Sequence, residues 1–250
     1  MIFVYQNKAI HYEFFETDST CPTIVLLHGW GGNCKSFTPI YSAFEGFNIL
    51  SLDFWGFGES DEPSSDFTLF SYTDATFELI SHLHLSDCIL LGHSFGGRVA
   101  IVLAANHSDI VKGLVLIDAA GLKPRFSAKR AYKIGCYKCN KFLVKHRLRN
   151  AACLEKYGSS DYKKLSSNVR PVFNAIINQG LSEFAQQIHC KTLIVWGQND
   201  KDTPLYMAKR LHRYVRNSNL CVVKNAGHFV YLDSSNIVIK CIKEFLNGFY

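Results

Sequence analysis

The sequence predicts an α/β fold, with a mostly parallel, doubly wound sheet and helices on both of its faces. Short apolar segments alternate along the 250-residue chain with segments of helical periodicity. The apolar segments are continuous, which is typical of strands buried on both faces of a parallel sheet. Glycine-rich polar clusters follow several of these strands, at the edge where open α/β sheets place their functional sites.

The order of the elements follows from these patterns. A hairpin is predicted at residues 2–6 and 9–15, where β-forming residues flank Asn7-Lys8. Buried strands are predicted at residues 23–27, 47–52, 88–91, 113–117, 192–196 and 220–223. Helices are predicted at residues 35–45, 70–84, 98–105, 204–214 and 234–246. Pro39 counts against the first of these helices, because proline lacks the N–H that an interior helical position donates.

Residues 123–187 interrupt the alternation of strands and helices. Helical patterns follow one another there without a strand, at about 128–143, 168–179 and 181–188, with a turn at 157–162. We therefore predict a core formed by residues 1–122 and 188–250, and an inserted helical lid formed by residues 123–187. Phe173 and Phe184 are expected to line an apolar pocket between core and lid.

Ser94 is the candidate nucleophile. It stands in Gly92-His93-Ser94-Phe95-Gly96, a G-x-S-x-G pattern between an apolar strand and a helix with small residues. A sharp turn from strand to helix holds the central serine in a strained conformation, and the glycines let neighbouring backbone approach. The N–H groups at the start of the helix would then face any negative charge that forms beside the serine.

Two further residues complete the chemistry that a serine nucleophile requires. Asp200 and His228 follow two later strands, so the chain order is serine, acid, histidine. A histidine can accept the serine proton near neutral pH and return it, and a buried carboxylate orients the imidazole. Asp118 and Asp202 are alternative acids. Both residues also have an interpretation without catalysis: Asp200 could cap a helix, and His228 could be a hydrogen-bonded histidine of the core.

Five blocks of the sequence together resemble the signature blocks of the α/β-hydrolase superfamily. They are His28-Gly29-Trp30-Gly31-Gly32, Asp53 to Ser60, Gly92 to Gly97, Trp196 to Asp200 and Asn225 to Phe229. The resemblance covers nearly the whole chain outside the lid. It implies catalytic roles for Ser94, Asp200 and His228, and an oxyanion hole formed by the backbone N–H groups of Trp30 and Phe95.

The resemblance also bears on the substrate. It implies that Trp30, Phe95 and Phe229 contact the substrate, whereas His28 and His93 pack the neighbouring loops. Serine at position 94 excludes the haloalkane dehalogenases and epoxide hydrolases of this fold, which use aspartate there. Carbon–carbon bond hydrolases have a similar lid, but they usually carry tryptophan after the catalytic histidine, where this chain has Phe229.

Composition and motifs limit the location and the cofactors. No apolar run is long enough to span a membrane and no signal peptide is recognised, so a cytoplasmic location is expected. The nine cysteines are scattered and are expected to be reduced. No metal site is predicted, because Cys136 and Cys139 lack the second ligand pair that zinc needs. No cofactor is expected, because the third glycine of a G-x-G-x-x-G motif would fall on Cys34.

Positive charge is concentrated in one segment. The net charge is +6, but ten of the 27 Lys and Arg residues lie between Lys123 and Arg149, where no acidic residue occurs. The pattern from Ala128 to Leu143 predicts an amphipathic, strongly basic helix. A solvated lid face is the plain interpretation, and attraction of an anionic substrate or of a membrane surface are the alternatives. No nucleic-acid recognition motif accompanies the charge, so nucleic acid is not an expected partner.

The expected function is that of a cofactor-independent serine hydrolase acting on a small molecule, a carboxylic ester of small to medium size. A carbon–carbon bond hydrolase acting on vinylogous diketones is a second hypothesis, because it uses the same three residues. A ligand sensor with slow or no turnover is a third, which the turnover number distinguishes. Binding of a partner through the basic lid is a fourth. The fold alone does not choose among them.

Overall fold

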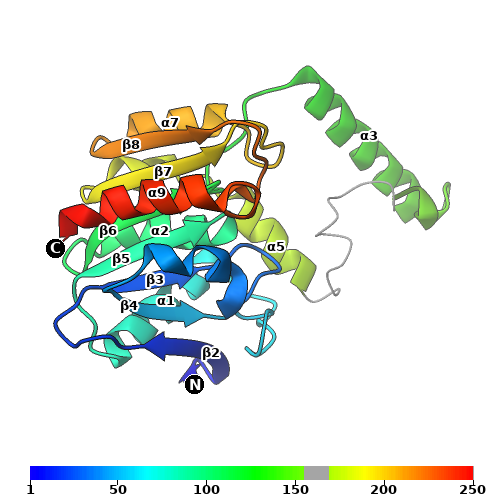
Figure 1. Cartoon of the computed structure of the whole chain (residues 1–250). Coiled ribbons are helices and arrows are strands. Elements are labelled where there is room, and N and C mark those ends of the chain that lie inside the picture. The colour runs from blue at the N-terminus through cyan, green and yellow to red at the C-terminus, as the bar shows by residue number, and fades with distance from the viewer. Residues whose placement is uncertain (155–168, 250) are drawn as a thin grey trace.

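A strongly twisted sheet forms the centre of the molecule (Figure 1). The computed structural model describes residues 1–154 and 169–249, so the turn predicted at 157–162 lies outside the described residues. Eight strands form the described sheet, in the order β1-β2-β4-β3-β5-β6-β7-β8. They are β1 (Ile2–Tyr5), β2 (Lys8–Phe15), β3 (Thr23–Leu27), β4 (Asn48–Leu52), β5 (Cys88–His93), β6 (Val111–Ile117), β7 (Lys191–Gly197) and β8 (Ser218–Val223).

The sheet is parallel except at one edge. β1 pairs antiparallel with β2 and β2 with β4, so the predicted hairpin forms this edge. All other neighbouring strands run parallel, and Val25 of β3, for example, pairs with Leu50 on one side and Leu90 on the other. The α/β fold with a mostly parallel sheet is therefore confirmed.

Side chains of the central strands alternate between two hydrophobic clusters, one on each face of the sheet. In β3, Val25 and Leu27 belong to one cluster, whereas Ile24 and Leu26 belong to the other. The first cluster is completed by α1 (Leu69–His82), α2 (Phe95–Asn106) and α7 (Tyr206–Tyr214). The second is completed by η1 (Cys34–Ala43) and α9 (Ser235–Leu246). Burial on both faces explains why the strands are continuous apolar runs.

Two elements differ from the sequence prediction. The helix expected at 35–45 is the 3₁₀-helix η1, which contains Pro39. Proline has no N–H and its ring clashes with the carbonyl four residues earlier, which disfavours an α-helix there. A short helix, α8 (Val230–Asp233), follows His228 and was not predicted. It is only one turn long, too short for a hydrophobic period to be recognised.

The described elements between β6 and β7 are all helical. They are α3 (Ala128–Lys145), η2 (Ala151–Leu154), α5 (Val169–Asn178) and α6 (Ser182–Gln186). In Figure 1, α3 projects away from the sheet. Helix α6 packs against α2 and α7. The boundaries of the lid at 123 and 187 stay a prediction. None of the described helices combines the length and apolar character needed to cross a membrane.

Gly96 lies in α2 where a side chain does not fit. A Cβ atom there would lie 1.9 Å from the carbonyl oxygen of Leu27. We expect Gly96→Ala to lower the free energy of unfolding by about 3 kcal/mol, because backbone in a close-packed region must move. Gly135→Ala in α3 is the control, since no described heavy atom outside the adjoining backbone of its own helix lies within 4 Å of its Cβ position. Urea unfolding measures both variants, and equal stabilities would contradict this packing argument.

Candidate active site

Ser94 occupies the turn between β5 and α2 in a strained conformation. Its φ is 49° and its ψ is −108°, a region that residues other than glycine rarely adopt. The turn is held because the Ser94 N–H donates to the Ile117 carbonyl at 3.2 Å and the Ser94 carbonyl accepts from the Ala120 N–H at 3.0 Å. A Cβ on Gly92 would lie 2.6 Å from the Gly96 carbonyl oxygen, so both flanking positions require glycine.

The structure brings Ser94, His228 and Asp200 into one hydrogen-bonded line. The Ser94 Oγ lies 3.0 Å from Nε2 of His228, and Nδ1 of that imidazole lies 2.9 Å from Oδ2 of Asp200. A carboxylate only accepts hydrogen bonds, so Nδ1 carries the proton and Nε2 is left to accept from the serine hydroxyl. Asp200 follows β7 and His228 follows β8, at the carboxyl edge of the sheet.

Further donors hold the Asp200 carboxylate in place. The Thr203 hydroxyl donates to Oδ2 at 2.6 Å, and the N–H groups of Asp202 and Thr203 donate to Oδ1 at 2.8 and 2.9 Å. Burial raises the pKa of Asp200, but the hydrogen bonds from His228 and Thr203 more than offset it and lower the pKa below its ordinary value. Asp200 is therefore ionised near neutral pH. Sequence reasoning missed Thr203, because nothing local distinguishes this threonine from a turn residue.

The environment of His228 favours its protonated form. Burial lowers the pKa of the imidazole, but the hydrogen bond and the charge of Asp200 outweigh burial and raise the pKa above the ordinary value. An imidazole whose pKa is raised in this way is a stronger base than an isolated one. The arrangement can therefore take a proton from Ser94 and hold it as imidazolium beside a carboxylate.

Asp118, the alternative acid, has different partners. It is fully buried, and its two carboxylate oxygens accept from the N–H groups of Gly197 at 2.8 Å and Val230 at 3.1 Å. Burial raises the pKa of this carboxyl to about 8. Asp118 thus joins the end of β7 to the helix after His228 and makes no hydrogen bond to the imidazole. Asp202, the other alternative, contributes its backbone N–H to Asp200.

The backbone N–H groups of Trp30 and Phe95 are placed as donors without acceptors. Trp30 follows β3, and Phe95 is the first residue of α2, where a helical N–H has no intrahelical partner. Within residues 1–154 and 169–249, neither N–H has a hydrogen-bond acceptor. Both therefore have the character that an oxyanion hole needs, although each lies on a different element of the fold.

His28 and His93 fix the loops around Ser94 as neutral imidazoles. His28 accepts from the Phe54 N–H at 3.0 Å and donates from Nδ1 to the Gly29 carbonyl at 2.7 Å. His93 donates from Nε2 to the His228 carbonyl at 2.9 Å. Burial lowers the pKa of His28 to about 4 and that of His93 to about 3, so both are uncharged at neutral pH. Both residues thus lie in the loop-packing positions expected of them.

Aromatic side chains surround this line of polar groups. The Trp30 ring makes edge contacts with Phe95, Phe57 and Phe173 at centroid distances of 5.3, 4.9 and 4.8 Å. Phe173 belongs to α5, so a helix between β6 and β7 contributes a ring to this aromatic cluster. Phe229 is 47% exposed beside the His228 ring, at a centroid distance of 5.5 Å.

Two of the expected pocket residues, Phe95 and Phe184, pack mainly against other parts of the core. The Phe95 ring is buried in the core, where it packs edge-on against Tyr72 at 5.2 Å. Phe184 of α6 packs beside the first cluster, where its ring contacts Phe70 at a centroid distance of 6.0 Å. Phe229 is therefore the expected pocket residue whose ring lies against His228.

Arg98 is a buried residue that sequence reasoning missed. It lies one turn after Ser94 in α2, and its Nη1 donates to the carbonyls of Ile176 and Gln179, both at 3.0 Å. These carbonyls end α5, so the guanidinium caps the helix that carries Phe173. The sequence signal is a lone cation in a helix of small apolar residues. Its acceptors are nearly eighty positions away, so only the fold reveals its role.

Asp53 organises a neighbouring turn. Its carboxylate accepts from the N–H groups of Cys34 at 2.6 Å and Glu59 at 2.9 Å, and from Nδ1 of His11 at 2.9 Å. A Cβ on Gly58 would lie 2.0 Å from this carboxylate, in keeping with the expected turn. His11, Cys34 and Asp53 are close enough to hold a metal ion, as are two groups that contain His228. Internal hydrogen bonds occupy the carboxylates of Asp53, Asp118 and Asp200 in these groups.

Two family models match most of the core. The model described as alpha/beta hydrolase fold matches residues 22–135, and a second, described as TAP-like protein, matches residues 178–248. The chain belongs to the α/β-hydrolase superfamily. This α/β hydrolase is 28% identical to the AB hydrolase superfamily protein YisY of Bacillus subtilis, over 90% of this chain and 91% of the relative.

Solved structures share the fold of this α/β hydrolase over nearly its whole length. The enol-lactonase from Burkholderia xenovorans is similar with a TM-score of 0.77 and 20% identity, covering 99% of this chain and all of the other. The meta-cleavage product hydrolase from Pseudomonas fluorescens is similar with a TM-score of 0.75 and 20% identity, covering 100% and 98%. These likenesses show the fold, and the family match makes the chain a hydrolase.

Proposed function

We propose that this α/β hydrolase cleaves carboxylic esters of small to medium size, with Ser94 as nucleophile, His228 as general base and Asp200 as its orienting acid. The observation that carries the proposal is the line from Ser94 Oγ through His228 to Asp200, with distances of 3.0 and 2.9 Å. The base lies within hydrogen-bond distance of the nucleophile on one side and of the orienting group on the other, as acyl transfer requires.

The first half of the reaction forms an acyl-enzyme. Ser94 Oγ attacks the ester carbonyl carbon while Nε2 of His228 takes the hydroxyl proton. The carbonyl oxygen becomes an oxyanion, which the N–H groups of Trp30 and Phe95 stabilise by about 3 kcal/mol each. The tetrahedral intermediate then expels the alcohol, whose oxygen receives the proton from His228. The carboxylate of Asp200 stabilises the imidazolium throughout.

The second half regenerates the serine. Water attacks the acyl carbon and gives a proton to Nε2 of His228, and the same two N–H groups stabilise the second oxyanion. Collapse of this intermediate breaks the bond to Ser94 Oγ, which takes back its proton, and releases the carboxylic acid. No group other than the residues of this chain and one water molecule is needed for the balance of atoms.

The surroundings of Ser94 support a substrate with an apolar part of modest size. The Trp30 ring packs edge-on against Phe173 and against Phe95, the residue after Ser94, and the Phe229 ring lies beside His228. The family resemblance to lactone- and carbon–carbon-cleaving structures leaves the leaving group open, because both reactions use a serine nucleophile. Phe229, in place of the tryptophan usual in carbon–carbon bond hydrolases, favours the ester.

The experiment is hydrolysis of p-nitrophenyl esters from acetate to decanoate, combined with fluorophosphonate labelling. We expect saturable turnover with an optimum among the short and medium chains, and one label per active molecule. Labelling without ester turnover would favour the carbon–carbon hypothesis, which a vinylogous diketone tests next. Labelling together with a very low turnover number would favour a ligand sensor. Failure of both labelling and turnover would contradict the proposed function.

A further inference from the structure

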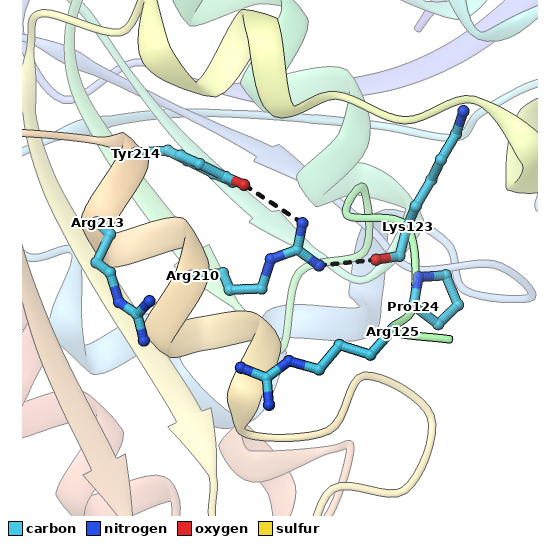
Figure 2. Close-up of a pocket in the computed structure, with 6 residues that line it drawn as sticks. All are labelled: Lys123, Pro124, Arg125, Arg210, Arg213 and Tyr214. Atoms are coloured by element: carbon cyan, nitrogen blue, oxygen red, sulfur yellow. Dashed lines mark hydrogen bonds between the residues drawn. The ribbon is translucent and has the colours of Figure 1, made fainter. Parts of the chain in front are cut away.

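A cleft beside α7 is lined mainly by basic side chains (Figure 2). It has a volume of about 420 Å³, which lies within the usual range of small-molecule sites. Its lining residues are Lys123, Pro124, Arg125, Arg210, Arg213 and Tyr214. The first three belong to the segment that leads from β6 to α3, and the last three belong to α7. The cleft therefore lies where the predicted lid leaves the core.

The Arg210 guanidinium is held in position by the protein itself. Nη1 donates to the Lys123 carbonyl at 2.8 Å, and Nη2 donates to the Tyr214 hydroxyl at 3.3 Å. Figure 2 shows the guanidinium between these two partners. The other N–H groups of the Arg210 guanidinium remain available to a ligand. A cation that is already ordered loses less conformational entropy when an anion binds.

Two more guanidinium groups border the same space. Arg125 lies over the Tyr206 ring, with 4.9 Å between Cζ and the ring centroid, and its backbone N–H donates to the Tyr206 hydroxyl at 3.2 Å. Arg213 is exposed, and its side chain makes no hydrogen bond to any residue that the structure describes. The Lys123 ammonium points away from the other cations in Figure 2. The charge inside the cleft therefore comes from the three arginines.

The positive charge of the cleft is not neutralised by nearby acids. Across the described parts of the chain, no carboxylate lies within 4.0 Å of Arg125, Arg210 or Arg213. Glu183 on the adjoining α6 and Asp202 before α7 make no ion pair with them. Arg210 lowers the pKa of the Tyr214 phenol through its hydrogen bond and its charge. A cleft lined by one sign of charge attracts and concentrates the opposite ion.

We propose that this cleft binds a phosphate monoester group. Planar guanidinium forks match phosphate oxygens in bidentate pairs, and a tetrahedral dianion can accept from several forks at once. A single carboxylate pairs well with only one fork. The proposal does not depend on the function of Ser94, because none of the cleft residues hydrogen-bonds to Ser94, His228 or Asp200.

The test compares glycerol 3-phosphate with glycerol by titration calorimetry at about 0.15 M salt, where weak surface attraction is screened. Wild type is expected to bind the phosphate ester and not glycerol. Arg213→Gln and Arg210→Gln are expected to weaken binding about tenfold or more, because each removes a charge-assisted hydrogen bond. Arg216→Gln is the matched control. It removes the same charge two residues beyond Tyr214, outside the cleft, and should bind like wild type.

A second arm identifies the source of the phosphate. Flotation with phosphatidylcholine vesicles, with and without phosphatidic acid, tests the same group on a lipid. Flotation that needs phosphatidic acid and is lost in Arg213→Gln supports the proposal with a lipid as source. Calorimetric binding without flotation supports it with a free metabolite. The proposal is overturned if neither probe binds, or if Arg213→Gln and Arg216→Gln bind equally well. Because Arg213 is exposed, Arg213→Gln is expected to fold. It therefore tests the proposal even if Arg210→Gln does not fold.

Discussion

Replacing Ser94 with alanine is expected to lower kcat for ester hydrolysis about a million-fold, to the level that binding and the oxyanion hole alone provide. The Ser94 hydroxyl forms the covalent bond to the acyl group, so no neighbouring group can take its place. KM should change little, because alanine leaves the pocket walls and the backbone N–H groups unchanged. Initial rates with the best p-nitrophenyl ester, together with circular dichroism, measure this.

Ser86→Ala provides a matched control for this variant. Ser86 is exposed and lies just before the amino end of β5, whereas Ser94 follows its carboxyl end. This variant should keep wild-type rates and wild-type labelling by fluorophosphonate. Mass spectrometry should place the label on the peptide that contains Ser94. A Ser94→Ala enzyme that retains more than about one per cent of wild-type kcat would contradict the assigned nucleophile.

Asp200→Asn is expected to lower kcat about ten-thousand-fold while leaving the fold intact. An asparagine can donate to Nδ1 of His228, which favours the tautomer whose Nε2 carries the proton and cannot accept from Ser94. Asp202→Asn removes the same charge two residues away and keeps the backbone N–H, so it should stay within about threefold of wild type. A comparison of kcat for the two variants separates the two candidate acids.

The pH profile supplies a readout that a merely structural role for Asp200 would not change. Activity needs neutral His228, so kcat/KM of the wild type should fall with decreasing pH, with a midpoint above the ordinary histidine pKa of about 6.5. Asp200 is the group that raises this pKa, whereas burial lowers it. The acid limb of Asp200→Asn should therefore move to lower pH. An unchanged limb would show that Asp200 does not act on His228.

The strands could be predicted from sequence because their signal is local. The strand predicted at residues 23–27 is β3 without any change of bounds, since a threonine followed by four consecutive apolar residues fits a strand buried on both faces. Ser94 could be predicted for the same reason, because the glycines that its strained φ requires are two positions away. Pro39 shows the limit, since the helical pattern around it produced a 3₁₀-helix instead of the expected α-helix.

The sequence favoured Asp200 as the acid through the family resemblance but left Asp118 as an alternative, because both are aspartates that follow buried strands. In the structure, different groups donate hydrogen bonds to the two carboxyl groups. The N–H groups of Gly197 and Val230 take both oxygens of Asp118, whereas Asp200 keeps one oxygen for His228 and Thr203. Such preferences depend on where distant backbone donors point, and no residue pattern records that direction.

The sequence by itself therefore determined the class of fold, the positions of the strands along the chain and the candidate residues Ser94, Asp200 and His228, because each depends on short-range periodicity, on a motif or on the family resemblance. The tertiary structure alone decided which groups meet. It placed Arg98 on the end of α5, His228 between Ser94 and Asp200, and three arginines around one cleft. These contacts join residues far apart in the chain, and only close packing of the folded elements brings such side chains within hydrogen-bond distance.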